Sequence, residues 1–204
     1  MEDYLKLRGG PIIGAVLDLP LADFISFQPS VQFAVKGTAH DMDERSDNHS
    51  THDFEGYDRV RVMYTEVPLN FAGKLELGPG SIQVFAGPYV AMAISGKNIY
   101  DYEVTHMDGS VSKEKGDLDV KFKGEVDEDD LDVDGVAFYQ RRLDFGVNFG
   151  VGYQWNALLF NAGYAMGFTN LQPDYKDAEN FDPKDFKYSN RSVFFTVAWL
   201  FGGE

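Results

Sequence analysis

The chain has 204 residues, of which 15% are aromatic and 21 are Gly, and it carries a net charge of −15 with no Cys. Without Cys it can form neither a disulfide framework nor a thiolate metal site, and its acidity disfavours contact with nucleic acid phosphates. No apolar run reaches the about 18 residues that a transmembrane helix needs. The length predicts a single domain over residues 1–204.

The negative charge is concentrated in three segments. Residues 101–136 contain 13 acidic and 4 basic side chains, residues 38–58 contain 7 and 1, and residues 171–190 contain 5 and 3. The rest of the chain is therefore nearly neutral. We interpret 38–58, 98–138 and 171–190 as long acidic loops.

Between these segments, apolar and polar residues alternate with period 2, which predicts β-strands and excludes amphipathic helices. The clearest alternation runs from 143 to 155, where the apolar face comprises Leu143, Phe145, Val147, Phe149, Val151, Tyr153 and Trp155. The opposite face comprises Asp144, Gly146, Asn148, Gly150, Gly152 and Gln154. In chain order we expect seven strands, at about 7–19, 24–37, 59–77, 81–97, 139–155, 158–170 and 190–201.

The composition of the two faces indicates the class of fold. The minor face is rich in Gly, Ala, Ser, Asn and Gln, which suits a narrow lumen, whereas the apolar face suits contact with lipid. Strands of this length can cross a bilayer when tilted. The sequence therefore predicts an all-β, up-and-down antiparallel transmembrane β-barrel in the bacterial outer membrane, in contact with lipid and monomeric. A soluble, lipocalin-like ligand-binding barrel is the alternative.

The connections support the membrane interpretation. Short turns are expected at 20–23, 78–80 and 155–157, and they alternate with the three long segments. Outer-membrane barrels have short periplasmic turns and long extracellular loops. Aromatic residues near the strand ends fit interfacial girdles: Tyr153, Trp155, Phe168, Trp199 and Phe201.

The parity of the strands predicts one more strand than the seven counted. Bacterial single-chain barrels have an even number of strands, and the strand at 7–19 leads into a short turn, so it descends towards the periplasm. An eight-stranded barrel would place an ascending strand, and a leader, before Met1. We expect an unclosed seam between 7–19 and 190–201, or a gap filled by another chain.

Several segments of the chain resemble the PorT-like outer-membrane β-barrel family of the Bacteroidetes. The resemblance covers about residues 9–201 and rests on Phe27-Gln28-Pro29, Val67-Pro68-Leu69, Gly87-Pro88-Tyr89, Ile94-Ser95-Gly96-Lys97, 143–152, Gly163-Tyr164, Gly167-Phe168-Thr169-Asn170 and 190–194. It implies an eight-stranded barrel made with a signal peptide. The family's named member belongs to a secretion apparatus, and no motif here carries that role over.

The sequence contains only incomplete motifs for metal binding. Asp130, Asp132, Asp134 and Gly135 match the first half of a calcium loop, but Arg141 stands where a bidentate Glu should be. His40, His49, His52 and His106 all fall in expected loops, so no zinc site is predicted. We therefore expect no catalytic, cofactor-binding or metal-binding residues and no cofactor.

Six charged residues fall on the minor face: Arg8, Asp18, Lys36, Glu66, Lys74 and Asp144. In a narrow lumen they must pair, because an unpaired buried charge is costly. We expect a salt-bridge network that fills the lumen. The predicted function is that of a non-enzymatic structural or surface-binding protein whose acidic loops contact a partner or cations; an accessory subunit of an envelope or secretion assembly is the alternative.

Overall fold

The computed structural model describes residues 5–8, 10–44, 52–106, 109–127, 130, 136–175 and 187–200. The elements with described bounds are β1 (Leu5–Arg8), β2 (Ile12–Val16), β3 (Leu19–Ala22), β4 (Ile25–Glu44), β5 (His52–Leu77), β6 (Gly80–His106), β7 (Val111–Phe122), β8 (Glu125–Val126), β9 (Val136–Gln140), β10 (Leu143–Trp155), β11 (Leu158–Gly167), β12 (Asp174–Tyr175) and β13 (Arg191–Trp199). No helix in this part of the chain is long and apolar enough to cross a membrane.

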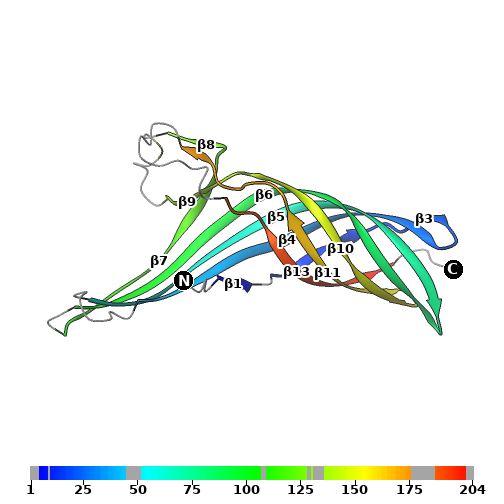
Figure 1. The fold of residues 1–204 in the computed structure, drawn as a ribbon, viewed down its shortest axis with the longest axis horizontal. Helices are drawn as coiled ribbons and strands as arrows, with labels where there is room; N and C mark the ends of the chain where they lie inside the picture. Colours follow the sequence, from blue (N-terminus) through cyan, green and yellow to red (C-terminus); the bar gives the residue numbers. More distant parts are fainter. Residues whose placement is uncertain are drawn as a thin grey trace.

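Eleven of these strands form one curled wall, antiparallel except for the β7–β9 pair, which confirms the predicted all-β, up-and-down fold (Figure 1). β8 and β12 form a separate parallel pair. The order in the wall is β1-β4-β5-β6-β10-β11-β13, with β2 and β3 paired to the same edge of β4 as β1. All seven expected strands are present, but the first is divided into β1, β2 and β3, and the fifth, expected at 139–155, is divided into β9 and β10. Pro11 lies in the break between β1 and β2, where it cannot donate a backbone hydrogen bond.

Short turns at 23–24, 78–79 and 156–157 join neighbouring strands at one end of the wall, here called the turn end. The first of them lies after β3, which occupies most of the turn expected at 20–23. Gly78 and Asn156 begin the turns after β5 and β10 with φ angles of 62° and 51°. Gly and Asn tolerate this left-handed region better than other residues. The opposite end of the wall is called the extended end.

Within the described residues, two of the three acidic segments consist mainly of strands, so the prediction of long loops at 38–58 and 98–138 is wrong for this part of the chain. β4 continues to Glu44, β5 begins at His52, β6 continues to His106 and β7 covers Val111–Phe122. β10 pairs with β6 from Gly80 to Met92, and β7 pairs with β6 from Lys97 to Thr105. Beyond the barrel, β4–β7 therefore form a projecting sheet (Figure 1).

The glycines of β10 give the wall its tight packing. A Cβ on Gly146 would lie 2.7 Å from the ring of Tyr89, and a Cβ on Gly150 would lie 2.6 Å from the ring of Phe85. Both rings belong to β6, the neighbouring strand, and both are buried inside the wall. The small residues on the minor face thus make room for inward aromatic side chains.

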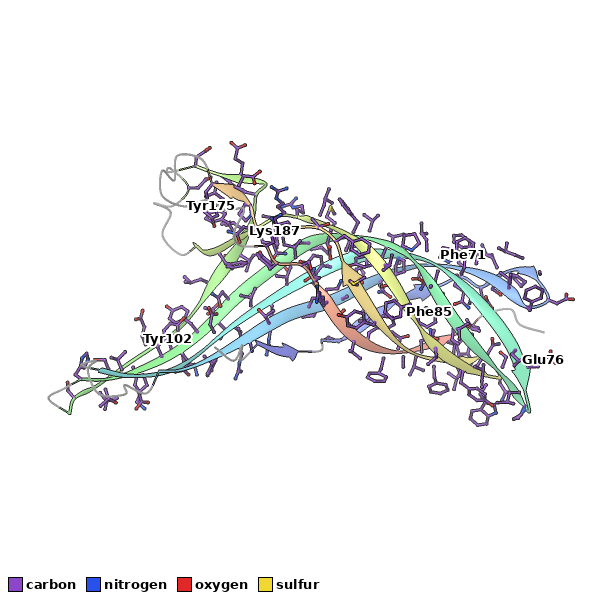
Figure 2. The ribbon with its side chains drawn as sticks, in the orientation of Figure 1. Phe71, Glu76, Phe85, Tyr102, Tyr175 and Lys187 are labelled. Carbon is purple, nitrogen blue, oxygen red and sulfur yellow. The ribbon has the colours of Figure 1, made fainter. Side chains whose placement is uncertain are left out.

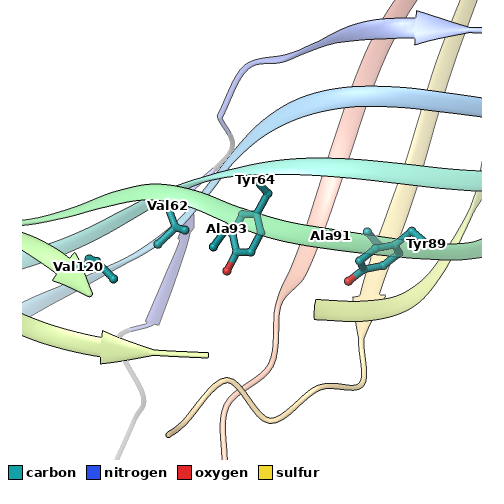
Figure 3. Close-up of a cluster of buried hydrophobic side chains, with 7 residues drawn as sticks. Val62, Tyr64, Tyr89, Ala91, Ala93 and Val120 are labelled. Carbon is teal, nitrogen blue, oxygen red and sulfur yellow. The ribbon is translucent and has the colours of Figure 1, made fainter. Parts of the chain in front are cut away.

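A small apolar core lies at the extended end of the lumen. Tyr64, Tyr89, Ala91, Ala93, Val62 and Val120 project inward from β5, β6 and β7 and pack together (Figure 3). Most other large apolar side chains point outward, as Phe71 does on the outside of β5. Phe85, by contrast, lies on the inside of β6 (Figure 2).

The wall is not closed. Within the described residues, no strand pairing joins β13 to β2, and the bonds of β13 run only to β11. The predicted unclosed seam is confirmed. The additional strand inferred from parity stays a prediction.

Candidate functional site

Two bands of polar side chains cross the lumen. The first lies nearer the turn end, where Lys74 of β5 forms an ion pair with Asp18, which follows β2. The Gln28 amide donates to Asp18 at 3.2 Å and to the Gln83 carbonyl at 3.0 Å. Gln83 in turn donates to the Asn161 carbonyl at 2.9 Å. This band links β4, β5, β6 and β11 across the interior.

The second band lies nearer the extended end and centres on Lys36 of β4. Its ammonium forms an ion pair with Glu66 and lies 4.0 Å from a carboxylate oxygen of Asp144. The ammonium also lies 4.8 Å and 5.4 Å from the ring centres of Tyr89 and Tyr64. The ammonium group of Lys36 thus lies close to two carboxylates and two aromatic rings.

Neutral donors complete this second band. Asp144 is 0% exposed and accepts hydrogen bonds from Tyr89 at 3.1 Å and Asn190 at 2.9 Å. Glu66 accepts one from Gln32 at 2.9 Å. Hydrogen bonds to charged acceptors are the stronger kind, and here they compensate one oxygen of each carboxylate for lost hydration.

The expectation of paired inward charges is confirmed for Asp18, Lys36, Glu66, Lys74 and Asp144. The side chain of Arg8 lies outside the described residues. The sequence did not identify Tyr64, Tyr89 or Asn190 as members of the network. For the two tyrosines, the alternation along β5 and β6 contained the signal, because both occupy inward positions among small residues.

A cap covers the extended end of the lumen; it comprises Phe138, Gln140, Arg141, Leu171, Gln172, Asp174 and Tyr188. Arg141 donates through its backbone to Leu171 at 2.8 Å and through its guanidinium to Gln172 and Asp174 at 2.9 and 2.8 Å. Tyr188 packs its ring against Phe138, and its burial raises the pKa of its phenol. The side-chain amide of Gln140 donates a hydrogen bond to the Tyr64 hydroxyl. The cap is thus tied to the second polar band.

A cavity of about 850 Å³ lies between the cap, the second band and the seam. Its polar lining includes Lys36, Glu66, Asn148 and Asn190, and its apolar lining includes Val60, Val62 and Phe194. A smaller cavity of about 170 Å³ follows the seam towards the turn end.

The projecting sheet carries a ladder of charges on one face. Lys97 pairs with Asp117, Lys113 with Glu103 at 2.6 Å, and Lys115 with Asp101 at 3.5 Å, each across the β6–β7 pair. On the other face Tyr100 and Tyr102 stack with ring centres 5.4 Å apart. Such cross-strand pairs stabilise a sheet, which explains why an acidic segment forms strands.

The family comparison decides where this barrel resides. A family model described as outer membrane protein beta-barrel domain matches residues 1–172. The chain belongs to this family. No curated protein and no solved structure matches the chain.

As an outer-membrane β-barrel protein, the chain places its apolar face against lipid. Outward residues of five strands remain exposed in the isolated chain, among them Val31, Phe33, Val67, Leu69, Phe71, Val84, Val90, Phe145, Phe149, Val151, Val193, Phe195 and Val197. The outer-membrane location and the lipid-facing strands are therefore as predicted, and the lipocalin-like alternative does not fit. The narrower resemblance to PorT-like proteins and the Bacteroidetes stays a prediction.

The weak metal motifs gain no support from the described residues. Asp130 pairs with Lys123, which lowers the pKa of its carboxyl, and Arg141 pairs with Asp174. Asp132, Asp134, Gly135 and His49 lie outside the described residues. The side chains of His40 and His52 also lie outside them. His106 lies at the end of β6, with its Nε2 2.8 Å from the Ser112 hydroxyl. In the described ranges no cluster of three potential metal ligands occurs.

Proposed function

We propose that this outer-membrane protein is a non-enzymatic, surface-binding barrel whose projecting sheet contacts a cationic partner. The observation that carries the proposal is the projection of β4–β7 beyond the rest of the barrel (Figure 1). A sheet that only closed the wall would need no such extension.

The outermost part of the projecting sheet has an excess of acid. Residues 41–44 of β4 and 52–55 of β5 include five acidic residues and no Lys or Arg: Asp41, Asp43, Glu44, Asp53 and Glu55. In the strand register Asp43 stands opposite Glu55, and Glu55 stands opposite Glu103. A cationic partner would complement this excess of acidic residues.

The two bands across the lumen support a binding role over a transport role. They occupy the interior with ion pairs and carboxamide bonds. An eight-stranded barrel is just wide enough to be filled by its own side chains. The ends of the barrel are then the parts left to act on other molecules.

Titration of the protein in lipid nanodiscs with calcium and, separately, with polylysine tests the proposal. We expect at least one of these probes to bind, with an affinity that falls as salt is added because exposed charges are screened. Asp43→Asn combined with Glu55→Gln should weaken binding about tenfold, which corresponds to about 1.4 kcal/mol. The matched control is Glu76→Gln, because Glu76 lies at the turn end (Figure 2). Absence of binding by the unmodified protein, or an equal loss in the control, would contradict the proposal.

A further inference from the structure

The two faces of the projecting sheet differ in how their charges are balanced. On the face of the charge ladder, the odd-numbered residues within 55–61, 97–103 and 113–119 include five basic and five acidic side chains. On the opposite face, here called the tyrosine face, the even-numbered residues within 54–60, 98–104 and 112–118 include no Lys or Arg. The acids of the tyrosine face in these ranges are Asp58 and Glu114. This face therefore carries a net negative charge.

Each tyrosine of this face stands between one acid and one glycine of the neighbouring strands. The two rows of directly opposed residues are Asp58, Tyr100 and Gly116, and Gly56, Tyr102 and Glu114. A Cβ on Gly116 would lie 2.6 Å from the hydroxyl oxygen of Tyr100. The Tyr100 ring therefore lies along the sheet over Gly116, with one of its π faces directed away from the sheet. Its plane is tilted by only 19° from that of the Tyr102 ring, so the two rings form a nearly flat aromatic surface.

Two oxygen acceptors beside Tyr100 have no hydrogen-bond donor within the described residues. They are Oδ1 of Asp58 and Oδ1 of Asn98, and the Asn98 side chain is almost fully buried, at 8% exposure. Asn98 precedes Tyr100 by two positions and lies on the same face. A buried acceptor without a donor is costly, so a molecule that supplies N–H groups is favoured here. Asp58 also borders the larger cavity, which leaves room beside it for a side chain of another molecule.

The opposite face of the same sheet shows which cation suits a tyrosine beside an acid. There the guanidinium of Arg59 lies 3.9 Å from the ring centre of Tyr57, and the Tyr57 hydroxyl donates to Asp101 at 3.4 Å. A guanidinium is planar, stacks on aromatic faces and offers five N–H donors, whereas an ammonium is a compact point charge. On the tyrosine face, Asp58 and Tyr100 are opposed in the same way as Asp101 and Tyr57.

We propose that Tyr100, Asp58 and Asn98 form a binding site for an arginine side chain of the partner. The guanidinium stacks on the Tyr100 ring, and its N–H groups donate to Oδ1 of Asp58 and Oδ1 of Asn98. Tyr102 extends the aromatic surface, and Glu114 adds negative charge at its edge. The inference rests on the cationic partner of the proposed function and identifies the chemical group that this partner supplies.

Binding of oligoarginine and oligolysine peptides of equal length tests the inference. The protein is held in nanodiscs of zwitterionic lipid, with empty nanodiscs as the background, at about pH 8, where an ordinary His is neutral. We expect oligoarginine to bind about fivefold more tightly than oligolysine, because only the guanidinium can stack and donate at the same time. Tyr100→Leu should remove most of this preference, and Tyr100→Phe should keep it because the ring remains. Asp58→Asn should weaken the binding of oligoarginine more than that of oligolysine.

Tyr57→Leu is the matched control, because the Tyr57 ring lies on the opposite face and already contacts Arg59. It should leave the preference unchanged. Equal affinity of the unmodified protein for both peptides, or an equal loss of preference in Tyr57→Leu and Tyr100→Leu, would overturn the inference. If that equal affinity falls when Asp43→Asn and Glu55→Gln are combined, the proposed function stands without the arginine site. Absence of binding by either peptide would contradict both.

Discussion

Lys36 and Asp144 lie on β4 and β10, three strands apart in the wall, and approach to 4.0 Å between the ammonium and a carboxylate oxygen across the lumen. Glu66 on β5 contacts the same ammonium. A single cation therefore connects three strands, and its removal would leave two buried carboxylates without a counter-charge.

Replacement of this cation should destabilise the barrel strongly. For Lys36→Met we expect a loss of about 3–5 kcal/mol in the free energy of unfolding, as is usual when one partner of a buried ion pair is removed. Urea-induced unfolding from lipid vesicles, followed by tryptophan fluorescence, measures it. The double variant Lys36→Met with Glu66→Gln should recover part of the loss. Equal stability of Lys36→Met and the unmodified protein would show that the cation does not hold the lumen together.

The lumen should not conduct ions as a porin does. The two polar bands and the cap occupy the path, and their carboxylates are held by Lys36, Lys74 and neutral donors. We expect planar bilayers containing the native protein to show no stable conductance of porin size, while a general porin in the same bilayers conducts. Steady porin-sized openings would show that the two polar bands and the cap do not block the lumen.

A charged substitution on the outward face should lower the free energy of unfolding only where that face contacts the hydrocarbon core of the membrane. Phe149 lies at the middle of β10 and Val111 at the start of β7 in the projecting sheet. Relative to Phe149→Ala, which accounts for the lost ring contact with Tyr164, Phe149→Arg should cost about 2–4 kcal/mol of unfolding free energy, the range for Arg at the bilayer midplane. Val111→Arg should leave it nearly unchanged. A similar cost at both positions would mean that the projecting sheet is also immersed in lipid.

The charge ladder of the projecting sheet should be visible in the titration of Lys97. Its hydrogen bond to Asp117, followed by the attraction of that carboxylate, raises the pKa of its ammonium. Because the folded-state pKa is raised, any stability from the pair is fully present below the ordinary Lys value of about 10.4 and is lost as pH rises through the folded-state pKa. We expect Asp117→Asn to return the pKa of Lys97 towards its ordinary value in a nitrogen-15 NMR titration.

Lys113 provides the internal control for this titration. Its pKa is raised by Glu103 and not by Asp117, so it should be unaffected by Asp117→Asn. Equal shifts of both lysines would point to a general change in the sheet instead of the loss of one pair.

The sequence by itself determined the class of fold, the two faces of each wall strand and the turn end. These features are local: alternation at period 2 and residues such as Gly78 and Asn156 act within a few positions. The same alternation placed Lys36, Glu66 and Asp144 inside the barrel. Since buried charges must pair, it also predicted that they would meet.

Only the tertiary structure decided which groups pair and how far the sheet extends. Asp144 accepts hydrogen bonds from Tyr89 and Asn190, which lie 55 and 46 residues away in the chain, and strand register sets such contacts. The acidic composition of 38–58 and 98–138 suggested loops, because Asp and Glu are depleted in strands. In the fold, Lys97, Lys113 and Lys115 meet acids on the neighbouring strand. This compensation depends on which strands become neighbours, so the long strands β6 and β7 are a property of the assembled sheet and not of either segment alone.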